Sequence, residues 1–549
     1  MANVLLQLNT TSTHETHADE ESTIINLDSR AKCCVYGKQE TFTQLVKGDD
    51  AIILIGYTCH IECESKLQTL TTILDSFDES QIVDLKMNLV GQFVILIKKN
   101  NHIYLFTDFI SSRNIFYSIT SHAVSSSFTK LETFLQTTVN DLDENKIFEF
   151  LSMRYVIFPG WLGQSTKHKR IKWLLPYEYL TINLADSSFR VTPVVYSIDN
   201  NKESDCARLA IDLIAILKFI TRRKEFKDSL VAASLTGGRD TRLVAAVAAD
   251  YYSNIKFRIA VSSRNANSVK DLKVARRVAK ARGIPLDVYY FQTDRDEERF
   301  YKITEGLTPA YNHSITPLIE SSQAYALGFG GAFGSQLFWP IKWTSIPEFI
   351  EAKLDVARKY LFIENGFWDE LYSSLLAQFQ KVKDTFRLSD TNDMDYIRLF
   401  QLLQTARYSS FIMSAYNRAG YQLEPYGSYA AMELALRVPP VLWGNHKKLC
   451  GDCKVQTMAM AILNPDMGKI ITYASFRPMV PLSVTTYPRF MIGYVKHHVQ
   501  WLSKKMQKMH QRSIRTNLTN GYHISDGWDN MFINRTMLTY GLSLRSEQM

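Results

Sequence analysis

The chain has 549 residues, of which 46% are hydrophobic and 21% are charged. Because a single hydrophobic core stops growing at roughly 250–300 residues, this length predicts two or more domains. The net charge of +8 is small for such a chain. It suits a surface that meets anions such as nucleotides, and it does not by itself indicate nucleic-acid binding.

Three features of the sequence favour a cytoplasmic protein. No apolar run reaches the roughly 18 residues that a transmembrane helix needs, so we predict no membrane span. The first residues lack the basic and long apolar segments of a secretory signal. Seven cysteines, an odd number in a large chain, favour a reducing compartment.

Residues 1–195 are predicted to form an α+β domain. The expected strands lie at 51–56, 93–97, 103–107, 115–118 and 174–183, with one helix at 143–155. Several short strands with few helices between them are typical of α+β rather than alternating architectures. The polar stretch at 197–205 marks the predicted domain boundary.

Residues 206–549 are predicted to form a second domain of α/β type. After a helix at 206–222, strands are expected at 230–234, 255–262 and 286–291, and helices at 241–251, 269–282, 350–376 and 396–413. Gly283 follows the helix predicted at 269–282, at the position where a glycine commonly ends a helix. Strands that alternate with helices predict a doubly wound parallel sheet, followed here by a largely helical part.

The turn after the first of these strands carries the strongest chemical signal. It reads Ser234-Leu-Thr-Gly-Gly-Arg-Asp-Thr, with Asp240 and Thr241 at its end. Glycines at a strand-to-helix turn allow close backbone approach, and the helix N-terminus attracts anions. Hydroxyl groups donate to phosphate, and a carboxylate holds Mg²⁺. The alternative is a plain turn with Asp240 as a helix cap, since a Gly-Gly turn is a weak motif and no lysine follows it.

The same turn resembles the S-G-G-x-D-S signature of ATP pyrophosphatases, with Thr236 and Thr241 at the two serine positions. Flanking segments extend the resemblance over nearly the whole chain and narrow it to the asparagine-synthetase-like family. These segments are 88–96, 107–117, 125–135, 171–180, 271–280 and 418–439. The resemblance implies an N-terminal amidotransferase-like domain of the Ntn-hydrolase type, and then an ATP-pyrophosphatase domain.

The resemblance also implies an activity. A carboxylate substrate is adenylated by ATP with Mg²⁺, pyrophosphate leaves, and an amine attacks the acyl-adenylate. Glu424 is implied to orient or deprotonate the amine, and Arg477 to stabilise the transition state. The implied nucleotide-binding residues are Ser234, Leu235, Thr236, Gly237, Gly238, Asp240, Thr241, Val261, Gly328, Gly330 and Gly331, and Asp240 is also the implied Mg²⁺ ligand.

The sequence departs from the family at three places. Ala2 stands where family glutaminases carry the cysteine nucleophile, so we expect no glutamine hydrolysis, as in the β-lactam synthetases and lasso-peptide cyclases. Ser335-Gln336 replaces the Asp-Glu pair of the second glycine loop. Arg477 stands near the place of a family lysine that stabilises the acyl-transfer transition state. Lys448 and Lys454 are other candidates for that role. It is equally open that no cation at this place is catalytic.

Two further functions remain open at this point. The chain could be a non-catalytic nucleotide-binding relative that serves as a partner subunit, because the second loop has lost its carboxylates. An ATP pyrophosphatase acting on tRNA has only the basic run at 494–516 in its favour, which is more simply the solvated face of a helix. We expect neither nucleic-acid nor membrane partners. A partner protein and a homo-oligomer both stay open.

The cysteine pairs Cys59/Cys63 and Cys450/Cys453 are interpreted as thiols rather than zinc ligands. A structural zinc site usually has four ligands in matched pairs, and these two pairs differ in spacing.

Overall fold

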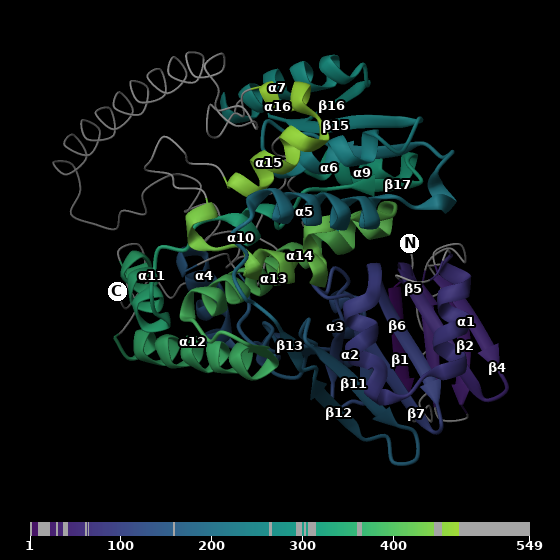
Figure 1. Cartoon of the computed structure of the whole chain (residues 1–549). Coiled ribbons are helices and arrows are strands. Elements are labelled where there is room, and N and C mark those ends of the chain that lie inside the picture. Colours follow the sequence, from purple (N-terminus) through teal and green to yellow (C-terminus); the bar gives the residue numbers. More distant parts are fainter. Residues whose placement is uncertain are drawn as a thin grey trace.

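The computed structural model describes residues 3–8, 22–28, 31–36, 42–60, 63, 65–156, 160–262, 266–291, 299–300, 303–305, 315–358, 365–443 and 453–470. Within these ranges antiparallel sheets come first and a parallel sheet follows, so the molecule is of mixed α/β type. Figure 1 shows the purple antiparallel strands at one end of the molecule and the teal parallel strands at the other.

Two six-stranded sheets occupy the N-terminal half. Their strands are β1 (Asn3–Leu8), β2 (Ser22–Asp28), β3 (Ala31–Tyr36), β4 (Phe42–Lys47), β5 (Asp50–His60), β6 (Leu89–Lys99), β7 (His102–Thr107), β8 (Phe116–Ser118), β9 (Ala123–Ser125), β10 (Lys172–Trp173), β11 (Glu178–Asn183) and β12 (Phe189–Pro193). The strand orders are β10-β8-β9-β1-β3-β2 and β12-β11-β7-β6-β5-β4.

These sheets pack face to face between two layers of helices. Side chains alternate along a strand, so Cys33 and Ile53 enter the core between the sheets while Cys34 and Ile52 face outward. Helices α1 (Lys66–Ser76) and α2 (Ile82–Asn88) cover the outer face of the second sheet. Helices α3 (Phe128–Leu135) and α4 (Glu144–Val156) cover the outer face of the first, which completes a four-layered sandwich.

The second half is built on a five-stranded parallel sheet of order β16-β15-β14-β17-β19. Its strands are β14 (Val231–Ser234), β15 (Ile255–Val261), β16 (Leu286–Tyr290), β17 (Leu327–Phe329) and β19 (Gln422–Leu423). The chain builds outward from β14 in one direction and then returns to add β17 on its other side. Such a reversal opens a crevice at the carboxyl ends of the two central strands, where ligands bind in open α/β sheets.

Helices make up most of the rest of the second half. They are α5 (Cys206–Thr221), α6 (Asp240–Ala249), α7 (Ala266–Arg282), α9 (Thr316–Ser321), α10 (Gly334–Phe338), α11 (Ile346–Arg358), α12 (Asn365–Thr385), α13 (Asp393–Ala419), α14 (Tyr429–Arg437), α15 (Lys454–Leu463) and α16 (Pro465–Lys469). Several of them cover this sheet, while α11 and α12 pack on α4 and α13 away from it (Figure 1). Short 3-10 turns occur at Glu79–Gln81, Val139–Asp141, Lys224–Phe226, Ser322–Ala324, Pro425–Gly427 and Pro440–Leu442. One hydrophobic cluster runs from α1 through the parallel sheet to α12, so the two halves share a core.

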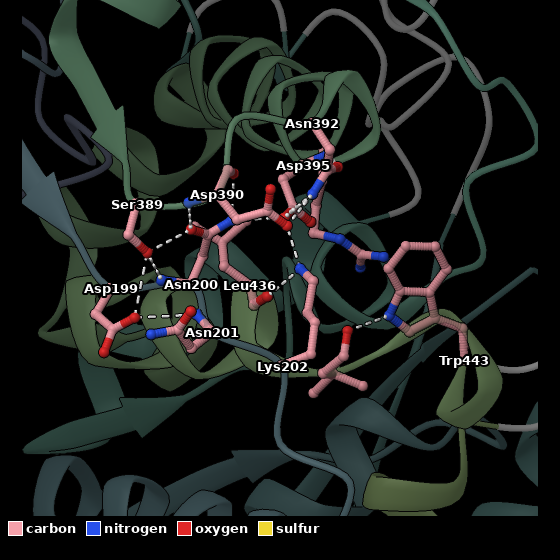
Figure 2. A network of polar contacts seen from close by, with 12 residues as sticks. Asp199, Asn200, Asn201, Lys202, Ser389, Asp390, Asn392, Asp395, Leu436 and Trp443 are labelled. Carbon is pink, nitrogen blue, oxygen red and sulfur yellow. Dashed lines mark hydrogen bonds and ion pairs between the residues drawn. The ribbon is translucent and has the colours of Figure 1, made fainter.

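A polar network, here called the linker clasp, fastens the connection between the halves (Figure 2). Strand β13 (Tyr196–Ile198) pairs in parallel with β18 (Phe386–Leu388), and the residues after it reach the start of α13. There the buried carboxylate of Asp395 accepts hydrogen bonds from Asn200 at 2.9 Å, Lys202 at 2.6 Å and Asn392 at 2.9 Å.

Most predicted elements are confirmed. The strands expected at 51–56, 93–97 and 103–107 lie in β5, β6 and β7, and the alternation from 230 to 291 is β14-α6-β15-α7-β16. Gly283 ends α7 with a φ of 64°, as a C-terminal glycine does.

Two predicted boundaries are wrong. Strand structure in 174–183 begins only at Glu178, because Pro176 has no N–H for a ladder and a turn closes from the Glu178 amide to the Leu175 carbonyl at 3.0 Å. The stretch 350–376 falls on two helices, α11 and α12, rather than one. Within the described part of the chain, no helix has the length and apolarity to cross a bilayer.

Candidate functional site

The first glycine loop, residues 235–241, runs from the end of β14 into the first residues of α6 at the crevice. Its ends are tied together by hydroxyl groups, since Thr236 Oγ1 lies 2.9 Å from Thr241 Oγ1, which also accepts a hydrogen bond from the Thr236 amide at 3.2 Å. The Gly238 amide donates to Thr236 Oγ1 at 3.1 Å. The N-cap of α6 is Arg239, so Asp240 is the first helical residue rather than the helix cap that the plain-turn interpretation assumed.

Both carboxylate oxygens of Asp240 accept hydrogen bonds from neutral side chains. Ser335 Oγ, at the start of α10, donates to Oδ2 at 2.8 Å, and Gln456 Nε2, from α15, donates to Oδ1 at 2.8 Å. Tyr426 also lies close: burial raises the pKa of its phenol well above the usual range, and the Asp240 charge adds to that rise. Ser335, which replaces a carboxylate of the family pattern, thus acts as a donor to the remaining carboxylate.

The second glycine loop, residues 330–334, packs against the first. A Cβ atom on Gly331 would lie 2.5 Å from the Thr241 amide nitrogen, and one on Gly334 would lie 2.5 Å from Asp240 Cγ. These glycines are required by the close approach of two loops. Phe333, between them, has a φ of 74°, a left-handed conformation that bulky residues seldom adopt and that often marks a functional loop.

Glu424 follows β19 and lies directly behind the second glycine loop. Its Oε2 accepts a hydrogen bond from the Ala332 amide at 2.9 Å, and its Oε1 accepts one from Gln422 Nε2 at 3.1 Å. Burial raises the pKa of Glu424 to about 7, against the opposing effects of these two donors and of the Arg258 charge. A carboxyl group with this pKa near a cleft is suited to general acid–base work at neutral pH.

The structure therefore brings the two loops and Glu424 together at one edge of the parallel sheet. Ser234 and Val261 end β14 and β15 at that edge, and Leu235 is buried beneath the first loop. Gly328 lies inside β17, under the loop rather than in it. Arg477, Lys448, Cys450 and the run 494–516 lie outside the described residues, and Lys454 is an exposed residue at the start of α15.

Sequence reasoning missed several residues of this site. Gln456 and Arg258 reach it from other elements, and no local pattern marks either one. Asp271 was noticed only as part of a helix, yet its Oδ1 accepts a hydrogen bond from the Gly237 amide at 3.1 Å. Burial raises the pKa of Asp271 to about 6. The Asp271 carboxylate thus already accepts the hydrogen bond that the Gly237 amide could otherwise donate to a phosphate.

A resident Mg²⁺ does not fit the protein groups at this site. Among the described residues, no three His, Cys, Asp or Glu side chains gather closely enough to hold a metal ion. Asp240 is the sole carboxylate of the two loops, and both of its oxygens already accept hydrogen bonds. Mg²⁺ commonly binds through one carboxylate together with substrate phosphates, so any ion here would belong to a metal–nucleotide substrate.

The described cysteines of the two pairs are free thiols. Cys59 Sγ donates to the Cys63 carbonyl oxygen at 3.1 Å. Burial raises the pKa of Cys453 to about 11, which disfavours its thiolate.

No family model matches the chain, and no curated protein matches it. Among solved structures, it is similar to glutamine phosphoribosylpyrophosphate (PRPP) amidotransferase from B. subtilis complexed with ADP and GMP, at 12% identity over 54% of this chain and 64% of that chain, with a TM-score of 0.19. A structure of the allosteric regulatory enzyme of purine biosynthesis matches at 10% identity over 65% of this chain and 72% of that chain, with a TM-score of 0.21. TM-scores of this size establish neither a shared fold nor a shared function.

Proposed function

We propose that the chain is an ATP-dependent carbon–nitrogen ligase that forms an amide bond through an acyl-adenylate. The observation that carries this proposal is the meeting of two glycine loops and the buried Glu424 at the switch point of a parallel sheet. Residues 206–549 are the proposed ATP-pyrophosphatase domain. Residues 1–195 are proposed as a degenerate class II glutamine-amidotransferase-like domain, and the four-layered sandwich supports this proposal.

The proposed reaction has two steps. An oxygen of the carboxylate substrate attacks the α-phosphorus of ATP, and the bond to the β-phosphate oxygen breaks, which releases pyrophosphate. The amine nitrogen then attacks the acyl carbon, AMP leaves, and the amine loses a proton. Electrostatic stabilisation of the phosphates is the main task of such a site.

The first loop is proposed to hold the pyrophosphate end of ATP. The first turn of a helix attracts anions through its N–H groups, and we assign this role to α6. The hydroxyls of Thr236 and Thr241 now bond to each other and would exchange that bond for bonds to phosphate. Mg²⁺ that arrives with ATP would bind the carboxylate of Asp240. That carboxylate would then give up its hydrogen bond from Ser335 or from Gln456.

Glu424 is proposed to accept the proton that the amine loses. Its pKa near 7 leaves a large ionised fraction at neutral pH, while its burial keeps competing water away. Arg477 and Lys454 remain candidates for a cation near the leaving AMP.

The test is ATP binding followed by product analysis. Magnesium with ATP should raise the thermal unfolding midpoint of the wild type, because a ligand at 100 times its dissociation constant adds about 2.7 kcal/mol to stability. Asp240→Ala should lose that rise, whereas Asp466→Ala, at an exposed ion pair with Lys469, should retain it. Candidate acids are then screened for release of AMP and pyrophosphate. Release of ADP would contradict the proposal.

A second candidate, a nucleotide-binding partner subunit without turnover, is favoured by one observation. The amides of residues 236–238 and both oxygens of Asp240 are already satisfied within the protein. AMP formation that depends on Asp240 would exclude this candidate. ATP binding with no AMP formation from any tested acid and amine would favour it. The tRNA-directed alternative rests on 494–516, which lies outside the described residues.

Asp271→Asn should bind ATP more tightly than the wild type at pH 7.5. The substitution keeps an acceptor for the Gly237 amide and removes a negative charge beside the proposed phosphate position. We expect a gain of about 1 kcal/mol, or roughly fivefold in the dissociation constant. Titration calorimetry with ATP measures it.

The same charge makes ATP affinity depend on pH. In the wild type the affinity should rise as pH falls through about 6, where Asp271 becomes protonated, and in Asp271→Asn this rise should be absent. If the two proteins show equal affinities and parallel pH profiles, Asp271 does not compete with phosphate.

A further inference from the structure

A chain of buried polar side chains runs behind Glu424. It starts at Arg258 in β15, which donates from Nη2 to Gln422 Oε1 at 2.7 Å. Gln422, in β19, donates from Nε2 to Glu424 Oε1 at 3.1 Å. Arg258 is fully buried and Gln422 nearly so, so the chain lies out of solvent along its length.

Arg258 is held in place from several sides. Its Nη1 donates to Ser322 Oγ at 2.7 Å and to the Leu318 carbonyl at 3.3 Å. The rings of Tyr325 and Tyr416 each lie 5.6 Å from the guanidinium carbon, at cation–π distance. A buried cation with this many contacts is a fixed anchor rather than a mobile side chain.

This anchor decides which way the Gln422 amide points. A guanidinium group has only donors, so the carbonyl end of Gln422 must face Arg258. Its NH₂ end therefore faces Glu424 and can only donate. The opposite oxygen of Glu424 meets a second fixed donor, the Ala332 amide. Both carboxyl oxygens are thus directed by donors whose orientation the protein fixes.

Two glycines of β17 and its loop make room for this chain. A Cβ atom on Gly328 would overlap Gln422 Oε1 and lie 2.9 Å from Arg258 Nη2. A Cβ atom on Gly330 would overlap the carboxyl group of Glu424. Neither glycine has a positive φ, so space rather than backbone freedom requires them.

We propose that Arg258 and Gln422 are positioning residues, which hold the carboxyl group of Glu424 toward the crevice and stabilise its ionised form. The role rests on the proposed function, because an ionised Glu424 is needed only if it accepts a proton from the amine. The side chains of Arg258 and Gln422 meet each other and Glu424, so the proposed role of each is exerted through Glu424.

Within the described part of the chain, two charged or titratable groups, Arg258 and Tyr416, interact electrostatically with Glu424. Arg258 comes from β15 and Tyr416 from α13; burial raises the pKa of Tyr416, and the Glu424 charge raises it further. The remaining neighbours, Gln422 and the Ala332 amide, are neutral donors. Loss of the Gln422 donor removes more support from the charged form of Glu424 than from its protonated form, because hydrogen bonds to a charged acceptor are stronger.

The test compares thermal unfolding midpoints at pH 5 and pH 8. Gln422→Leu should lower the midpoint more at pH 8, where Glu424 is ionised, than at pH 5. The titration of Glu424 should move up by about one pH unit. Adding Glu424→Gln to Gln422→Leu should abolish the excess loss at pH 8. Arg258→Lys, which keeps the charge but not the planar fork, should show the same trend to a smaller degree.

The control is Gln404→Leu, the same substitution at another buried glutamine, whose Nε2 donates to the Trp161 carbonyl at 3.4 Å. Its loss should be equal at the two pH values. The proposal is overturned if Gln422→Leu behaves like this control, or if its loss at pH 8 survives the addition of Glu424→Gln.

These measurements need no substrate. A chain that binds no ATP and releases no AMP would refute the proposed function and still give a clear result for the coupling between Gln422 and Glu424. If AMP is released but the coupling does not change with pH, the positioning role fails and the proposed function stands.

Discussion

Asp395→Ala should lower the free energy of unfolding by roughly 3–5 kcal/mol, because three donors lose a buried charged acceptor and hydrogen bonds to charged groups contribute about 1.5–3 kcal/mol each without being fully additive. The Asp395 side chain is 1% exposed and accepts hydrogen bonds from Asn200, Lys202 and Asn392. Without it, three donors lose their acceptor, and Lys202 keeps only the Leu436 carbonyl at 2.6 Å. Urea denaturation, followed by far-UV circular dichroism, measures the loss.

Asp466→Ala is the matched control for this prediction. The Lys469–Asp466 pair has a similar separation of 2.9 Å, but its side chains are 63% and 78% exposed. Exposed pairs contribute little, so the control should lose less than about 1 kcal/mol. Equal losses in the two variants would mean that the linker clasp holds its segment no more firmly than a surface ion pair does.

The linker clasp also shows what a single sequence could not predict. The polar stretch at 197–205 is predicted to be a domain boundary, and β13 and the start of α5 lie around it. Its partners lie on α13, far along the chain, and no local period connects Asn200 with Asp395. Contacts of this kind depend on how elements pack, which hydrophobic periodicity does not encode.

Strand and helix positions were predictable where one physical signal dominated. The runs at 51–56 and 93–97 are apolar because β5 and β6 are central strands with both faces buried. By contrast, β4 lies at the edge of its sheet and exposes much of its surface, so it gave no clear pattern. The three strands β1, β2 and β3 were likewise not identified individually.

The glycines of the second loop show that a sequence motif can have a structural reason other than the one the motif suggests. Gly328, Gly330 and Gly331 were assigned to nucleotide binding from the family pattern. In the structure each of them faces protein atoms, of Gln422, Glu424 and Thr241 respectively. Their nucleotide contacts remain a prediction, whereas their packing role follows from the distances to these neighbours. The pattern therefore coincides with glycines that the packing of this loop requires in any case.

Glu424→Gln should make the protein more stable relative to the wild type as pH rises from 5 to 8. Burial raises the pKa of Glu424 from 4.5 to about 7 in the folded state. A carboxyl group that is harder to ionise when folded costs no stability below its unfolded pKa. The cost grows between about pH 4.5 and 7 and is constant above, where it amounts to about 3 kcal/mol. Glutamine does not titrate, so the Glu424→Gln variant does not lose this stability as pH rises.

The measurement is the difference in unfolding free energy between variant and wild type at several pH values. Glu424→Gln loses one of its two accepted hydrogen bonds, since an NH₂ group replaces one oxygen, but that loss is the same at every pH. Glu348→Gln is the control: hydrogen bonds from Thr344 lower the pKa of Glu348, so it stays ionised across this range and its difference should be flat. A flat difference for Glu424 as well would mean that its carboxyl group ionises as easily in the folded chain as in water. Glu424 would then lack the raised pKa that suits it to act as a base near neutral pH.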